Sequence, residues 1–328
     1  MKKFKPKFNR VLMVCHHDTV TGGPEAMHQL CSTLRSIGCE SSIIYYADHL
    51  NISETHAHSI EPSEKVKLAY KKYDTPHENS LTLNDNDIII FPEIYAKIAT
   101  SKFVCKIGIW WLSVDNAINW NPILKYKHIS QPIFTNKDII HFYQSEYAHR
   151  YLIENTAKII APLFDYTAIE IKPENSSHVN EKVYDIAIFP NKGGNLAADF
   201  LAKEPSLKYV QIINMSKEQV SKSLSDTHIY IDFGNQPGKD RIPREAAACG
   251  CLVFLHRQGS ASYYEDSPLD DFFLFTSDDI STGNLGGRIK FALENMQEIT
   301  TFQDYYKNKI KNEKSEFEFQ CINFFTTV

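Results

Sequence analysis

The chain has 328 residues, of which 43% are apolar and 23% are charged, a composition that excludes a disordered chain and fits an ordinary globular enzyme. At about 150 residues per domain, this length predicts two domains. The net charge of −5 excludes a general nucleic-acid binder, because neutralising many phosphates requires an excess of cations. A chain of this charge that handles a phosphate must gather its few cations locally.

The seven cysteines are odd in number and widely spaced, and no secretory signal precedes them, which predicts free thiols in a reducing cytoplasm. Cys249 and Cys251 are one residue too close for a zinc knuckle, so we expect them to pack as small apolar side chains. No stretch is apolar enough to span a membrane. The basic start over residues 1–10, interleaved with Phe4 and Phe8, is either a solvated end or a peripheral contact with the inner face of the plasma membrane.

The first half of the chain predicts a parallel α/β unit. Apolar runs predict strands over residues 10–15, 41–46, 87–91 and 105–112, with shorter strands over 133–135 and 158–161. Apolar residues at helical spacing over 26–37 predict a helix that Gly38 ends. The polar stretch 51–84 is expected to run over the surface.

The second half predicts another series of the same kind. Strands are expected over 185–189, 209–213, 228–232 and 252–255, and helices after Gly193, over 216–224 with Ser216 as the cap, and over 243–250. The apolar-poor spacer 170–181 predicts a linker. The expected organisation is therefore a first domain over 1–172, a second over 173–301, and a C-terminal helix over 302–328 that packs back on the first domain.

Three cations gather in the loop and first helical turn after the strand 228–232: Lys239, Arg241 and Arg244. Cations at a helix N-terminus oppose the helix dipole, unless an anion lies between them and the free N–H groups. The loop therefore predicts an anion site at the carboxyl end of a strand, where open α/β sheets bind ligands. The alternative is that Asp240 and Glu245 pair with these cations on a solvated turn.

The run Arg-Glu-Ala-Ala-Ala-Cys-Gly at 244–250, followed by Cys-Leu-Val, resembles an element of GT-B glycosyltransferases, in particular family 4 and bacterial capsule and lipopolysaccharide enzymes. The resemblance implies two Rossmann-like domains and a cytoplasmic, metal-independent hexosyltransferase. It implies a nucleotide-diphosphate sugar as co-substrate, no other cofactor, and a glycan or lipid-linked acceptor. Glu245 matches the second of the family's two glutamates, which contacts the ribose, and Pro237 stands where the first would be.

The same resemblance implies roles for further residues. Donor contacts are expected from Gly22, Gly23, Lys192, Gly238, Lys239, Arg241, Arg244 and Glu245. Acceptor contacts are expected from Glu25, Glu93 and Trp111, and candidates for the general base are Asp115, His17 and Asp18. For Trp111, stacking on a sugar and packing in the core are both open.

Two other functions fit the same fold. A nucleotide-sugar epimerase would convert the donor without an acceptor. A binding protein that has lost catalysis would explain Pro237 at the position of an acidic residue.

Overall fold

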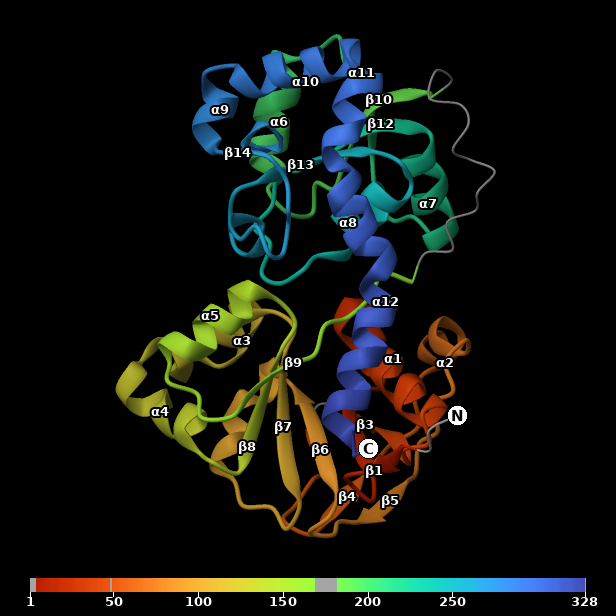
Figure 1. Cartoon of the computed structure of the whole chain (residues 1–328), viewed down its shortest axis with the longest axis vertical. Coiled ribbons are helices and arrows are strands. Elements are labelled where there is room, and N and C mark those ends of the chain that lie inside the picture. The colour runs from red at the N-terminus through yellow and green to blue at the C-terminus, as the bar shows by residue number, and fades with distance from the viewer. Residues whose placement is uncertain (1–3, 48, 169–181, 328) are drawn as a thin grey trace. The chain divides into compact units, whose positions relative to one another are not determined.

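The computed structural model describes residues 4–47, 49–168 and 182–327 (Figure 1). The chain divides into two compact units, the first formed by Met1–Tyr166 with Lys314–Val328 and the second by Thr167–Glu313. The linker expected over 170–181 and the boundary expected at 172/173 lie outside the described residues. Each unit is described separately below.

The first unit contains a six-stranded parallel sheet with the order β3-β2-β6-β7-β8-β9. Its strands are β2 (Val11–His16), β3 (Ser41–Tyr46), β6 (Ile88–Pro92), β7 (Lys106–Trp111), β8 (Ile139–Tyr143) and β9 (Ile160–Pro162). The chain adds β3 on one side of β2 and then returns to add β6 on the other, so the strand order reverses between β2 and β6. Open parallel sheets bind ligands at the carboxyl ends of the strands flanking such a reversal.

Helices cover both faces of this sheet, which explains why its strands are apolar on both sides. Along β2, Val11, Met13 and Cys15 join one buried cluster with α1, α2 and the end of α12, whereas Leu12 and Val14 join another with η1, α3, η2, α4 and α5. These helices are α1 (Gly22–Ser36), α2 (Glu64–Tyr70), η1 (Glu93–Thr100), α3 (Val114–Trp120), η2 (Pro122–Lys125), α4 (Lys127–Thr135), α5 (Glu146–Glu154) and α12 (Asp304–Phe325).

Two expectations for the first half are wrong in detail. Residues 133–135 belong to helix α4 rather than to a strand, because Ile133 and Phe134 pack together into the buried cluster beside Trp111 and a three-residue run carries no readable period. The stretch 51–84 is not only a surface excursion: it contains α2 and an antiparallel pair, β4 (His56–His58) and β5 (Ser80–Thr82). Its apolar side chains Ala57 and Leu81 are buried.

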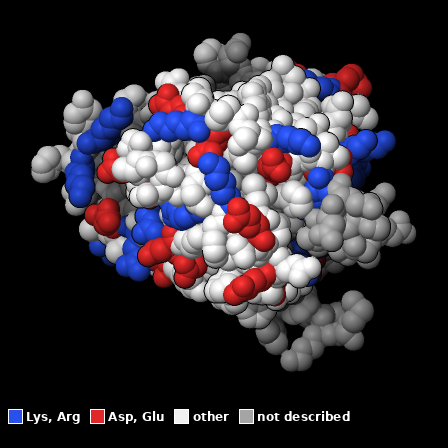
Figure 2. All heavy atoms as spheres, turned by 90° about the horizontal axis from the view of Figure 1, so that it is seen from above, with Lys and Arg blue, Asp and Glu red and all other residues white. Residues whose placement is uncertain are grey.

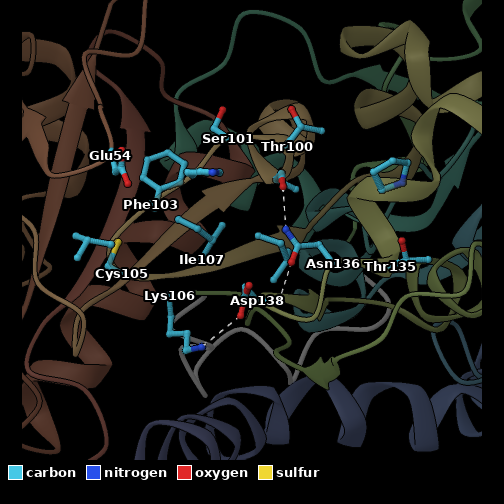
Figure 3. Close-up of a pocket in the computed structure, with 15 residues that line it drawn as sticks. Glu54, Thr100, Ser101, Phe103, Cys105, Lys106, Ile107, Thr135, Asn136 and Asp138 are labelled. Atoms are coloured by element: carbon cyan, nitrogen blue, oxygen red, sulfur yellow. Dashed lines mark hydrogen bonds and ion pairs between the residues drawn. The ribbon is translucent and has the colours of Figure 1, made fainter.

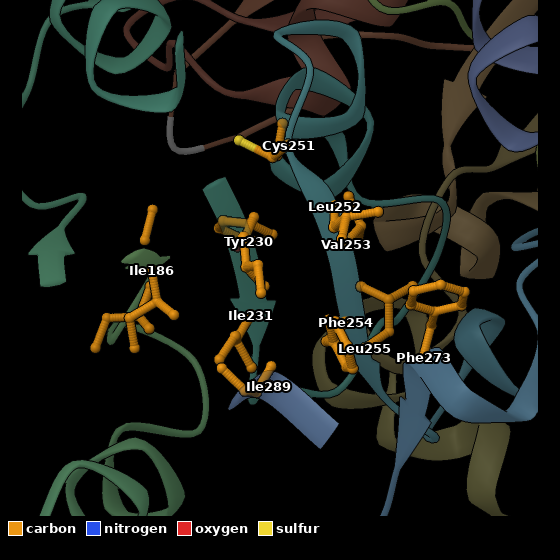
Figure 4. Close-up of a cluster of buried hydrophobic side chains, with 14 of the residues drawn as sticks. Ile186, Tyr230, Ile231, Cys251, Leu252, Val253, Phe254, Leu255, Phe273 and Ile289 are labelled. Atoms are coloured by element: carbon orange, nitrogen blue, oxygen red, sulfur yellow. The ribbon is translucent and has the colours of Figure 1, made fainter. Parts of the chain in front are cut away.

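The second unit contains a five-stranded parallel sheet with the order β11-β10-β12-β13-β14. Its strands are β10 (Tyr184–Ile188), β11 (Tyr209–Gln211), β12 (Thr227–Asp232), β13 (Leu252–His256) and β14 (Leu274–Phe275). The order reverses between β10 and β12. Figure 4 shows the buried core along these strands, with Ile186, Ile231 and Phe254 among its members.

The second unit contains several short helices together with the part of α12 up to Glu313. The short helices are α6 (Gly194–Lys203), α7 (Lys217–Ser225), α8 (Arg241–Ala248), η4 (Ser260–Ser262), η5 (Asp271–Phe273), α9 (Ser277–Ser281), α10 (Asn284–Glu294), α11 (Met296–Ile299) and η6 (Thr300–Gln303). The predicted cap of α7 is confirmed, because Ser216 accepts a hydrogen bond from the backbone N–H of Gln219 and the Gln219 side chain accepts one from Ser216 N–H.

The C-terminal half of α12, from Lys314 onward, packs on the first unit, as predicted, whereas its residues up to Glu313 belong to the second unit. The Phe317 ring is fully buried and lies parallel to the Trp110 ring, with 6.3 Å between centroids. Gln320 accepts a 2.7 Å hydrogen bond from the backbone N–H of Phe164. After α12, strand β15 (Thr326–Thr327) pairs antiparallel with β1 (Lys5–Pro6) in the first unit.

Candidate functional site

Two loops meet at the carboxyl edge of the second unit's sheet, one after β10 and one after β12. Gly193 has φ +66°, and a Cβ there would lie 2.1 Å from the carbonyl oxygen of Phe233. A Cβ on Gly234 would lie 2.4 Å from Cβ of Lys192. Both positions therefore require glycine, and the close approach places Lys192 at the point where the strand order reverses.

The Lys192 side chain faces the start of α8. Its ammonium forms an ion pair with the carboxylate of Asp240, the residue that precedes α8, and about a third of the side chain is exposed. Arg241 is the first residue of α8 and is half-buried. Lys192 in the loop after β10 and Arg241 at the start of α8 thus lie at the same edge of the sheet, as expected for one site.

Lys239 and Arg244 have a different environment from the one expected. Both side chains are almost fully buried and pair with Glu313 of α12, at 3.5 Å from Lys239 Nζ to Oε1 and 2.9 Å from Arg244 Nη1 to Oε2. Arg244 also donates to the backbone carbonyls of Lys239 and Asp240. The anion between these cations is therefore a carboxylate of the chain itself, and their geometry supports a structural role rather than the predicted donor contact.

Sequence reasoning missed a buried carboxyl at this edge. Asp232 ends β12, is 1% exposed, and accepts hydrogen bonds from the Tyr230 hydroxyl at 3.0 Å and from Gly234 N–H at 2.9 Å. Burial raises its pKa to about 6. The only signal in the sequence is a single acidic residue at the end of an apolar run, directly before a glycine.

Buried side-chain atoms without a hydrogen-bond partner occur both in the loop between β12 and α8 and at the end of β13. Within the described ranges, Nε2 of Gln236 and Nδ1 of His256, which ends β13, are buried without a hydrogen-bond partner. Both side chains are less than 5% exposed. Gly238 is held by a 2.7 Å hydrogen bond from the Ser260 hydroxyl to its carbonyl, and Glu245 is half-buried on α8. Unsatisfied buried polar groups are uncommon in folded proteins. His228 and Arg288 of the same unit also carry such atoms, so these atoms alone do not define a ligand site.

In the first unit, the loop between β2 and α1 holds several predicted residues. His17 is half-buried, and Gly22 and Gly23 are the first two residues of α1. Asp18 pairs with Lys65 at 2.9 Å, and the hydrogen bond from Lys65 lowers its pKa. The ion pair with Lys65 occupies the Asp18 carboxylate and stabilises its ionised form, which weakens it as a proton acceptor.

The two predicted acceptor glutamates are both buried. Glu25 is buried on α1, where it accepts a 3.0 Å hydrogen bond from the Tyr73 hydroxyl and pairs with Lys72. Glu93 follows β6 directly, is 5% exposed, and accepts a 3.3 Å hydrogen bond from Leu112 N–H. Burial raises the pKa of Glu93 to about 8, so this carboxyl is protonated at neutral pH. Because it flanks the reversal between β2 and β6, it is the acidic group of the first unit best placed for a ligand.

Two predicted site residues, Trp111 at the end of β7 and Asp115 in the following helix, differ in their surroundings. Asp115 lies in the first turn of α3 and accepts a 2.9 Å hydrogen bond from the Tyr147 hydroxyl. Trp111 is fully buried, donates to Nδ1 of His141 at 3.0 Å and stacks on Phe134. The structure therefore supports core packing for Trp111 and leaves its ring no open face for a sugar.

The first unit also has a hollow at the other edge of its sheet (Figure 3). It measures about 850 Å³ and is lined by residues at the amino ends of β7 and β8 and the preceding loops. In Figure 3 Lys106 pairs with Asp138 at 3.7 Å, and Asn136 donates to the Ala99 carbonyl at 3.1 Å. This hollow lies at the edge opposite to the carboxyl ends, so it is not the expected donor or acceptor site.

The surface charges are mixed. On the face shown in Figure 2, Lys and Arg side chains are interspersed with Asp and Glu side chains, and no large area of one sign is visible.

Among the residues that the structure describes, no helix has both the length and the apolarity that a membrane crossing requires.

No protein-family model and no curated protein sequence matches the chain. Solved structures do match. The Anabaena protein HepE, solved in complex with UDP-glucose, superposes with a TM-score of 0.68 at 12% identity over 96% of this chain and 98% of its own. Sucrose-phosphate synthase from Thermosynechococcus elongatus gives 0.59 at 13% identity over 95% and 97%.

A glycosyltransferase from Rickettsia africae superposes with a TM-score of 0.52 at 14% identity, over 96% of this chain and 94% of its own. Such low identities establish the fold and not the reaction. The superpositions extend over nearly the whole chain and so include both parallel sheets and the helices that cover them. The chain therefore has the GT-B fold of two Rossmann-like domains, as the resemblance implies.

Proposed function

We propose that the chain is a metal-independent glycosyltransferase that moves a hexosyl group from a nucleotide-diphosphate donor to a glycan or lipid-linked acceptor, in bacterial surface polysaccharide synthesis. The observation that carries the proposal is the contact between the two loops at the strand-order reversal of the second unit, with Lys192 and the start of α8 beside it. The similarity to solved glycosyltransferases supports the same reaction class.

The donor diphosphate would bind at this carboxyl edge. Lys192 and Arg241 would supply positive charge, and the free backbone N–H groups at the start of α6 and α8 would donate hydrogen bonds to the anion. On binding, the diphosphate would replace Asp240 as the partner of Lys192 and stabilise the leaving group as charge develops on it. Glu245 on α8 would contact the ribose, as the resemblance implies.

The acceptor would bind at the carboxyl edge of the first unit's sheet. His17, Asp115 and Glu93 each follow one of its strands. One of them would take the proton from the acceptor hydroxyl as the bond to the sugar forms and the bond to the diphosphate breaks. The Glu93 carboxyl, protonated at neutral pH, fits better as a hydrogen-bond donor to a sugar hydroxyl, which leaves His17 and Asp115 for the base.

Calorimetry with UDP, UDP-glucose, ADP and GDP tests the donor site. UDP-glucose comes first because it is bound in HepE. We expect Lys192→Ala and Arg241→Ala each to weaken binding about tenfold, as loss of one charge-assisted contact does. Lys208→Ala is the matched control, because this exposed lysine precedes β11 at the opposite edge of the same sheet. Equal affinity in all variants would contradict the site.

Product analysis separates the three candidate functions. A transferase consumes the donor fully only when an acceptor is present, whereas an epimerase alters the sugar of the donor alone. Binding without turnover across a panel of glycan and lipid-linked acceptors would favour the catalytically inactive protein that Pro237 suggests.

A further inference from the structure

A short segment of the first unit exposes three large apolar side chains to solvent, although other apolar side chains of the same segment are buried. Trp120 ends α3 with 72% of its surface exposed, Tyr126 follows η2 with 61%, and Ile129 lies in the first turn of α4 with 59%. Around them Leu124 and Ile133 point into the core. The three exposed side chains lie within ten residues of one another, on α3, after η2 and on α4, and η2 packs against both helices. We call this segment, residues 120–129, the α3–α4 patch.

The charge of the segment is opposite to that of the chain. Residues 116–137 contain Lys125, Lys127 and Lys137 and no acidic residue, whereas the whole chain has more acidic than basic residues. Residues 125–129 read Lys-Tyr-Lys-His-Ile, and all five are exposed. Exposed aromatic and aliphatic side chains that alternate with lysines are thus concentrated in one place.

This combination matches the boundary of an anionic lipid bilayer. Tryptophan and tyrosine favour the interface between headgroups and acyl chains, where their apolar rings are buried and their polar atoms stay hydrated. Lysines beside them are attracted to anionic headgroups, and their flexible side chains reach outward while the apolar residues insert. A polyanion without an apolar layer would leave Trp120 and Ile129 in water.

We propose that the α3–α4 patch docks the first unit on an anionic membrane surface. The basic N-terminal segment is a weaker candidate for this role. Phe8 packs on Phe324 and Phe325, Arg10 pairs with buried Asp87, and Lys7 donates to the carbonyl of Asn323. Phe8, Lys7 and Arg10 are thus engaged by the first unit itself, whereas the α3–α4 patch presents both apolar and basic side chains to solvent.

Membrane docking does not depend on the proposed function. One consequence does rest on it: if the chain is a glycosyltransferase, a membrane-docked first unit favours a lipid-linked acceptor. The docking itself is tested without donor or acceptor, so failure of sugar transfer and failure of docking are distinguishable.

Tryptophan fluorescence reports on the patch directly. The chain has three tryptophans, and Trp110 and Trp111 are fully buried, so a change on vesicle binding comes from Trp120. The full chain is mixed with phosphatidylcholine vesicles that contain about one-third phosphatidylglycerol, and with vesicles of phosphatidylcholine alone. We expect co-sedimentation with the anionic vesicles, a blue-shifted emission, quenching by brominated lipids and release at high salt.

Variants separate the patch from other surfaces. Lys125→Glu with Lys127→Glu should weaken binding to anionic vesicles about tenfold or more, and Trp120→Ser several-fold. Trp120→Phe should keep most of the binding and lose the emission change. Leu68→Ser, at an exposed position of α2, and Lys71→Glu, directly after α2, are the matched controls. Both variants should bind vesicles like the wild type.

Four outcomes would overturn the proposal. They are no binding to anionic vesicles by the wild type, binding with unchanged tryptophan emission, binding that survives the double charge reversal, and concentration-dependent self-association that Ile129→Ser abolishes. The last would show that a second copy of the chain covers the patch. Urea unfolding of each variant verifies that a lost signal is not a lost fold.

Discussion

Arg244 donates a 2.9 Å hydrogen bond to Glu313, and both side chains are almost fully buried in the second unit. The residues are 69 positions apart, on α8 and α12. Glu313 also accepts hydrogen bonds from the backbone N–H and the hydroxyl of Thr167, each at 3.0 Å. One carboxylate therefore joins the helix that follows the candidate donor loop to the C-terminal helix.

Replacing that carboxylate should be costly. Glu313→Gln keeps the shape of the side chain but removes the negative charge that pairs with buried Arg244 and buried Lys239. Breaking a buried ion pair from one side destabilises a protein by about 3–5 kcal/mol. Urea unfolding should show a fall of this size for the variant, against little change for exposed Glu294→Gln on α10. A loss below about 1 kcal/mol would mean that the interior around Arg244 is hydrated.

Gly193→Ala should disrupt the loop contact at the strand-order reversal. The added Cβ would overlap the carbonyl of Phe233, and the backbone has φ +66°, which an alanine adopts only at a cost. We expect lower stability by more than about 1 kcal/mol and weaker nucleotide binding. The next residue is the control, because Gly194 has nothing within 4 Å of its Cβ direction. Similar behaviour of Gly193→Ala and Gly194→Ala in thermal unfolding and calorimetry would refute the close approach.

The buried Glu93 carboxyl makes stability depend on pH in a definite direction. Its pKa rises from 4.5 to about 8, so between these values the folded chain holds a proton that the unfolded chain releases. The free energy of unfolding should therefore fall as the pH rises through this window, on the order of a few kcal/mol. Asp232, with a pKa raised from 3.8 to about 6, acts in the same direction at lower pH.

Glu93→Gln removes this titration and preserves an oxygen that accepts from Leu112 N–H. Urea unfolding of wild type and variant at about pH 5 and about pH 9 gives the double difference. We expect the variant to lose less stability on going to high pH. An equal loss in both proteins would show that Glu93 is ionised in the folded state at neutral pH.

Strand and helix patterns predicted most of the fold because they are local. The strand predicted at 10–15 and the end of the helix before Gly38 are found within about one residue, whereas that helix begins four residues earlier than predicted, and Ser216 caps α7. The pattern failed at 133–135, where a three-residue apolar run fits either period. The order of strands, and so the two reversals, is set by long-range packing that no single segment specifies.

The candidate site was predictable in part for the same reason. The loop after β12 was identified from its cations, but the role of each cation depends on a residue distant in the sequence. Glu313 lies on a helix whose register could not be read, so the burial of Lys239 and Arg244 could not be foreseen. Trp111 is similar: its neighbours Phe134 and His141 are brought to it by other elements.

The anchoring of α12 can be tested on two phenylalanines of the same helix. Phe317 is fully buried between the rings of Trp110 and Tyr166, whereas Phe319 is 63% exposed. Phe317→Ala opens a cavity and should destabilise the first unit by about 3–5 kcal/mol, because the lost apolar contacts are not regained by relaxation. Phe319→Ala should change stability by less than about 0.5 kcal/mol. Urea unfolding followed by tryptophan fluorescence detects the difference, since Trp110 contacts Phe317 directly. Equal effects would mean that α12 lies on the first unit in another register, and its return across that unit would have to be reassigned.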